Sequence, residues 1–122
     1  MAIVLIFYIC NATLLLLHEI ESAYEREWEI LKLPGKITGF LLLHIPVILL
    51  LFWGLIELYQ QSTTGWVIAL LSGAGGLIPF FIHKVFIKRE GYFENPLSTS
   101  LIILNMITGV GTVLFTILQF IK

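Results

Sequence analysis

The chain alternates between four long apolar runs and three polar connections. The apolar runs cover about residues 2–18, 37–57, 66–87 and 97–121. An apolar stretch near twenty residues is long enough to cross the hydrocarbon layer of a membrane as a helix. The pattern therefore predicts an all-α fold, a four-transmembrane-helix bundle, in which residues 1–122 form a single integral membrane domain.

The polar segment that follows the first run predicts an unusually long first helix. Residues 18–33 are rich in strong helix formers and contain no helix breaker before Pro34 and Gly35. We therefore expect the first helix to continue unbroken, past the membrane on its cytoplasmic side, to about Leu33.

The positive charges are distributed unequally between the connections. Only Lys122 lies on the side of the short second connection and the termini, whereas the first and third connections hold the other six lysines and arginines: Arg26, Lys32, Lys36, Lys84, Lys88 and Arg89. Basic residues are concentrated on the cytoplasmic side of membrane proteins. The distribution predicts that these two connections are cytoplasmic and that both termini lie outside.

Composition narrows the class of protein further. Hydrophobic residues make up 58% of the chain and charged residues 12%, about half the charge of a soluble domain. The net charge of −1 offers no basic surface for nucleic acid. The single cysteine, Cys10, excludes a disulfide framework. The lipid bilayer is the expected partner.

Small residues gather in the last two helices. The third helix contains the run Ser72–Gly76, and the fourth contains Gly109, Gly111 and Thr112. In lipid, small residues allow helix backbones to approach closely. They indicate either packing of these two helices within one chain or the contact face of a homo-oligomer.

Polar side chains from all four helices fall within one shallow layer at the cytoplasmic side. These residues are His18, His44, His83 and Asn105. Ionisable residues within a membrane are costly and usually face the bundle interior or a wet cavity. Since histidine is also the commonest metal ligand, the layer is a candidate metal site.

The ligand set we expect combines imidazoles with a carboxylate. His18 and Glu21 lie one helical turn apart and can bind the same ion, and His44 and His83 complete a site suited to zinc or iron. Ser22 lies on the same helical stripe as His18, and Asn105 lies at the same depth. We expect both to support the ligands.

A metal centre of this kind suggests a membrane enzyme that acts on a lipid-like substrate. Metal-bound water is a potential nucleophile, and Glu25 or Glu27 would serve as the proton shuttle. On a continuous helix, Glu27 would point nearly opposite to His18, among apolar residues, an odd place for a solvated charge.

The sequence is also compatible with two other functions. The glutamates of residues 18–33 can form a solvated helix face that pairs with nearby basic residues. The protein would then be a structural or regulatory membrane subunit without chemistry. A small-molecule transporter of this size is the third alternative, although the charge asymmetry fixes one orientation and no acid lies in the middle of a span.

One sequence motif resembles a known group of proteins. The segment His18-Glu19-Ile20-Glu21, followed by Glu27, is similar to that of the HXXEE-type families of small, uncharacterised four-helix bacterial membrane proteins. Ser22 stands where the second acid of that motif would be. The resemblance implies a metal-dependent membrane protein in the bacterial inner membrane, and it supports the site without naming a reaction.

Overall fold

The computed structural model describes residues 1–86 and 95–121, and in these residues all regular structure is helical. In chain order the elements are α1 (Ala2–Tyr24), α2 (Glu27–Ile30), α3 (Lys36–Tyr59), α4 (Thr63–Gly75), α5 (Ile78–Phe80), the π-helical segment η1 (Phe81–Phe86) and α6 (Pro96–Phe120). The expected all-α fold is confirmed.

Four segments are long and apolar enough to cross a membrane. They are α1, α3, the composite segment Thr63–Phe86 and α6, with 23, 24, 24 and 25 residues. At 1.5 Å per residue each is about 35 Å long, which exceeds the hydrocarbon thickness of ~30 Å. The chain is therefore a multi-pass membrane protein with the predicted four spans.

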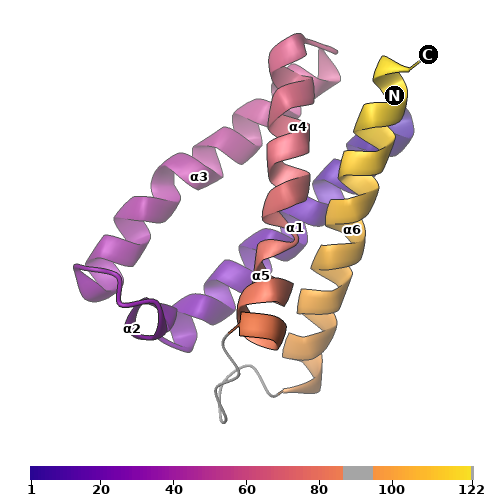
Figure 1. The fold of residues 1–122 in the computed structure, drawn as a ribbon. Coiled ribbons are helices and arrows are strands. Elements are labelled where there is room, and N and C mark those ends of the chain that lie inside the picture. The colour runs from indigo at the N-terminus through magenta and orange to yellow at the C-terminus, as the bar shows by residue number, and fades with distance from the viewer. Residues whose placement is uncertain (87–94, 122) are drawn as a thin grey trace.

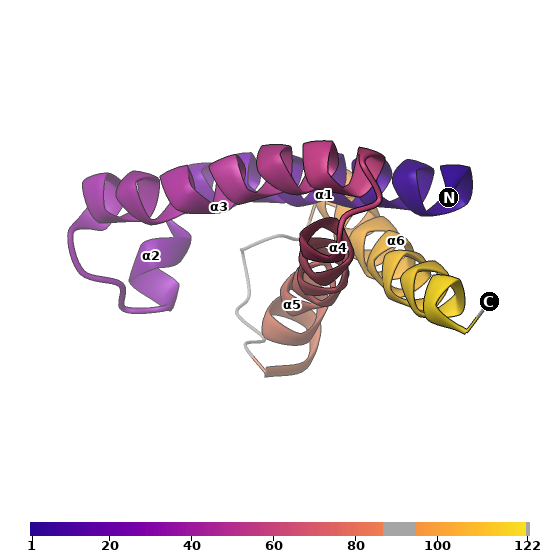
Figure 2. The same ribbon diagram turned by 90° about the horizontal axis from the view of Figure 1, so that it is seen from above.

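The spans form a bundle in which α1 packs along α6, and α4 packs against both α3 and α6 (Figure 1). Seen from above, α1 and α3 run across one side of the bundle, and α4 and α6 lie below them (Figure 2). The start of α1 and the end of α6 lie at one end of the bundle, and α2 lies at the other. Which end faces the cytoplasm stays a prediction from the charge distribution.

Small residues bring two helices into backbone contact within the chain. A Cβ atom added to Gly73 of α4 would lie 2.9 Å from the carbonyl oxygen of Gly109 in α6, and one added to Gly109 would lie 2.6 Å from the carbonyl oxygen of Gly73. Neither position has room for a side chain. These glycines therefore serve packing within one chain, and the homo-oligomer stays a prediction.

The prediction of an unbroken first helix to Leu33 is wrong. Helix α1 ends at Tyr24, and Arg26 adopts the left-handed conformation with φ 56°, so that α2 turns back toward the bundle. The turn buries Trp28, whose ring lies 5.7 Å from the ring of Phe40 in α3.

The physical reason for this break is tertiary packing. A left-handed non-glycine residue costs on the order of 1–2 kcal/mol, and burying a large apolar side chain contributes roughly 1.5–3 kcal/mol. Burial of Trp28 therefore offsets the strain at Arg26, and Lys32 and Lys36 further along the same connection are also left-handed. Helix propensities differ by less than about 1 kcal/mol per residue and do not decide the outcome.

Candidate metal centre

Three buried side chains from three different segments converge beside the end of α1. His18 of α1, Glu27 of α2 and His83 of η1 each offer one ligand atom, and these atoms lie within 4.8 Å of one another. His83 Nε2 lies 3.0 Å from Glu27 Oε1, and the two imidazole rings lie 5.2 Å apart. We refer to these residues as the triad.

Helix α1 places His18 on its buried face. This face carries Tyr8, Asn11, His18 and Ser22 at helical spacing. Ser22 follows His18 by one turn, and its Oγ lies 3.3 Å from His18 Nε2. Because α1 is continuous from His18 to Tyr24, the predicted position of Ser22 beside His18 agrees with the structure.

The chain reversal at Arg26 brings Glu27 to the triad. The side chain of Glu27 is only 7% exposed. Burial by itself would raise the pKa of Glu27, but hydrogen bonds to His83 and Ser22 and the proximity of the imidazoles hold that pKa below its ordinary value. Glu27 is therefore a carboxylate at neutral pH, which is the form that binds a metal ion.

A break in the third span sets the position of His83. Helix α4 ends at Gly75, Pro79 has no N–H to donate, and the residues from Phe81 to Phe86 form a π-helical turn. Single π-helical turns are rare and occur frequently at functional sites. The wider turn presents His83 toward the triad, and its side chain is only 5% exposed.

His44 does not join the triad but pairs with a residue that the sequence did not single out. His44 Nε2 lies 2.7 Å from Glu19 Oε2, and His44 Nδ1 donates to the carbonyl oxygen of Phe40 at 2.6 Å. We refer to Glu19 and His44 as the pair.

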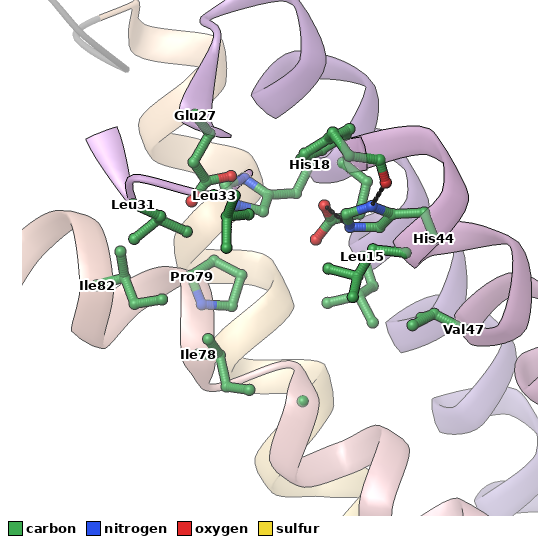
Figure 3. A pocket seen from close by; sticks show the side chains of 14 residues that line it. Leu15, His18, Glu27, Leu31, Leu33, His44, Val47, Ile78, Pro79 and Ile82 are labelled. Atoms are coloured by element: carbon green, nitrogen blue, oxygen red, sulfur yellow. Dashed lines mark hydrogen bonds and ion pairs between the residues drawn. The ribbon is translucent and has the colours of Figure 1, made fainter. Parts of the chain in front are cut away.

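A cavity of about 260 Å³ joins the triad to the pair. Its wall includes His18 and Glu27 on one side and Glu19 and His44 on the other, and Figure 3 shows His18 and Glu27 pointing toward each other. Apolar side chains form the rest of the wall, among them Leu15, Val47, Ile78, Pro79 and Ile82. The cavity is thus an apolar space with two polar groups of residues at its margins.

The structure brings together two of the four predicted ligands, His18 and His83, and adds Glu27 in place of the others. Glu21 is half-buried, and its Oε2 has no hydrogen-bond partner among the described residues. Glu25 caps the end of α1. Neither belongs to the cluster of close ligand atoms, so their proposed roles as ligand and proton shuttle stay predictions.

Asn105 lies deeper in the bundle than the triad. It is fully buried, and its backbone carbonyl packs beside Gly76 and Asn11. Because α1 is continuous from Asn11 to His18, the backbone of Asn105 lies about 10 Å, or two helical turns, from the level of His18. Its expected contact with the ligands stays a prediction.

The donor set of the triad fits a transition metal. Two imidazoles and one carboxylate are the ligands of many catalytic zinc sites, which keep a fourth position open. The same set holds iron(II) in many oxygenases. Ligand atoms bound tetrahedrally at ~2.0–2.2 Å lie about 3.3 Å apart, close to the 3.0 Å between His83 Nε2 and Glu27 Oε1.

The fold and the site together define a four-span membrane protein with a buried cluster of histidine and glutamate. The chain belongs to a family of unknown function, DUF6713, whose sequence profile matches residues 4–119. Neither the curated proteins nor the solved structures gave a significant match to the chain. Membership of the HXXEE-type families stays a prediction.

Proposed function

We propose that the protein is an integral membrane metalloprotein in which His18, Glu27 and His83 bind one divalent transition metal ion, zinc or iron. The observation that carries this proposal is the convergence of three ligand atoms within 4.8 Å from three separate segments. The three ligand atoms come from different segments, so no single helix brings them together. The chain must turn back at Arg26 and break after Gly75 to produce it.

The burial of the triad supports the same reading. Glu27 and His83 are each less than a tenth exposed, and His18 is 2% exposed. Burying a carboxylate costs several kcal/mol unless the carboxylate is paired with a cation or fully hydrogen-bonded. A bound divalent ion would compensate the charge of Glu27 more fully than its hydrogen bonds to His83 and Ser22 do.

The open side of such a centre would face the 260 Å³ cavity. A bound metal would supply Lewis acidity or an activated water at that position. The residues of the chain would then exclude bulk water and orient a substrate, because the remaining wall is almost entirely apolar. This surrounding supports a metal-dependent enzyme that acts on a lipid-like substrate.

The site is proposed to lie on the cytoplasmic side of a bacterial inner membrane. The triad is located at the end of the bundle opposite the two termini. The first connection, which contains α2, and the third connection carry six of the seven basic residues in the sequence. The resemblance to the HXXEE-type families supports the bacterial membrane.

Metal analysis of the purified protein tests the proposal. Wild-type protein, equilibrated with zinc or iron(II) in detergent and then desalted, should retain stoichiometric metal by mass spectrometry. His18→Ala and His83→Ala should lose it. His44→Ala is the matched control, because His44 lies on the same cavity but outside the triad, and it should retain the metal.

Two results would overturn this assignment. Wild-type protein that holds no more metal than His83→Ala would leave a structural or regulatory membrane subunit as the better reading. If His44→Ala loses as much metal as His83→Ala, His44 is a ligand, as the sequence analysis predicts. Size-exclusion profiles of all variants should coincide, so that a loss of metal is not a loss of fold.

A further inference from the structure

The pair formed by Glu19 and His44 lies between two hollow regions of the molecule. One is the cavity shared with the triad. The other is an apolar groove of about 300 Å³ between α1 and α3. Glu19, His44 and Phe40 line both regions. The pair is therefore the polar boundary between the triad cavity and the groove.

The groove opens toward the surroundings of the bundle. Ile20 is 68% exposed, Leu41 55% and Phe52 56%, and all three line the groove. Because α1 and α3 are long and apolar enough to span a membrane, we expect this opening to face hydrocarbon chains. Apart from the pair, every side chain that lines the groove is apolar. These surroundings match an alkyl chain.

The charged groups around the pair restrict which polar head group a lipid bound in the groove can have. The cavity wall contains two carboxyl groups and two imidazoles, and none of the described residues that line it is lysine or arginine. Phosphates and carboxylates are normally recognised by those basic side chains. In the metal-free protein an anionic head would be repelled by the Glu27 carboxylate, whereas a hydroxyl or carbonyl group could hydrogen-bond to the pair.

We propose that the pair binds the uncharged polar head of a long-chain lipid, such as a fatty alcohol or a monoacylglycerol. The alkyl chain lies in the groove between α1 and α3, and the head enters the cavity toward the triad. The reaction at the head rests on the proposed metal centre, whereas the binding itself does not. Glu19 and His44 are thus assigned as head-binding residues.

Photo-crosslinking in lipid nanodiscs tests this assignment. The probe is a long-chain alcohol with a diazirine in its chain, and the comparison probe is the fatty acid of equal length. Peptide mapping should place the alcohol label on α1 and α3. On protein stripped of metal with a chelator, the acid should label at least roughly tenfold less, because its carboxylate would be buried beside the carboxylate of Glu27.

Variants separate the groove from the head site. Ile48→Trp narrows the groove and should reduce alcohol labelling roughly tenfold, because the larger side chain occupies the space of the alkyl chain. Ile107→Trp, on the exposed face of α6, is the matched control and should label normally. His44→Ala should weaken competition by unlabelled alcohol roughly tenfold through a lost hydrogen bond.

Equal labelling of Ile48→Trp and Ile107→Trp, or labelling by the acid as strong as by the alcohol, would overturn the proposal. Metal content is measured on the same preparations before chelation. Metal retention without selective labelling would refute the lipid site alone. Selective labelling of a wild-type protein that holds no metal would refute the metal centre alone. His83→Ala should lose the metal but should still be labelled by the alcohol probe.

Discussion

Glu27 and Glu57 lie at opposite ends of the bundle, each beside a turn, but their partners differ in kind. Glu57 accepts from Trp53 Nε1 at 3.1 Å and from the hydroxyl of Ser62, both within five residues along the chain. Glu27 meets His83, which is 56 residues away. The first arrangement is local and the second depends on the whole fold.

The two turns share one backbone feature. Each contains a left-handed residue that is not glycine, Arg26 in one and Gln61 in the other, and both have φ 56°. At the Glu57 end the turn only reverses a long hairpin between α3 and α4. At the Glu27 end the same conformation inserts a carboxylate into the triad. Similar local geometry therefore serves connection in one place and a site in the other.

The largest expected difference is in stability after removal of each carboxylate. Glu27→Ala should lower the free energy of unfolding by about 3 kcal/mol, because it breaks a buried polar cluster. Glu57→Ala should cost less than about 1 kcal/mol, because its partners are local and its site is only half-buried. Unfolding in mixed detergent micelles measures both, and equal losses would erase the contrast.

Valine at the two left-handed positions should separate connection from site. Arg26→Val and Gln61→Val should each cost about 1–2 kcal/mol, since a β-branched residue resists that conformation. Only Arg26→Val should also weaken metal retention, because only that turn carries a ligand. If Gln61→Val releases metal equally, general destabilisation rather than the position of Glu27 controls the centre.

The two serines beside the carboxylates offer a finer comparison. Ser62 caps α4 by accepting from the amide of Gly65 at 2.9 Å, and Ser62→Ala should cost about 1 kcal/mol without changing metal content. Ser22→Ala should cost a similar amount or less but lower metal affinity at least roughly tenfold, since Ser22 contacts His18. Metal competition with a calibrated chelator measures the difference.

Glycine at the same two left-handed positions should give the smallest effect, and of the opposite sign. Arg26→Gly and Gln61→Gly remove the strain and should raise stability by about 0.5–1 kcal/mol. Metal retention should stay unchanged in both, because the turn is preserved. A decrease in stability for Arg26→Gly alone would show that the exposed ion pair of Arg26 with Glu29 outweighs the strain.

Hydropathy alone predicts the four spans, because membrane insertion depends on run length and apolar content. The shared face of His18 and Ser22 also follows from helical spacing. The turn at Arg26 does not follow, since the local sequence favours helix and the packing of Trp28 on Phe40 decides the outcome. The odd apolar surroundings that a continuous helix would give Glu27 are the one signal that could have revealed it.

The pairing of His44 with Glu19 is equally hidden in the sequence. Depth in the membrane places both near one level, but the partner of His44 depends on the rotation of α3 about its own axis. That rotation is fixed by contacts of α3 with α1, α2 and α4. Counting residues from the end of a span gives the depth of a residue in the membrane but not the direction in which its side chain points.

The position of His83 late in the chain has a consequence for biogenesis. The ribosome completes His18 and Glu27 early, whereas His83 follows Glu27 by 56 residues, or roughly 3–11 s of synthesis. Three side chains stabilise the Glu27 carboxylate in the folded protein, namely Ser22, His18 and His83. Until the third span has inserted, only Ser22 and His18 have been placed near it. The triad can therefore form only after the third span has inserted. A chain truncated after α3 lacks His83 and cannot form the triad.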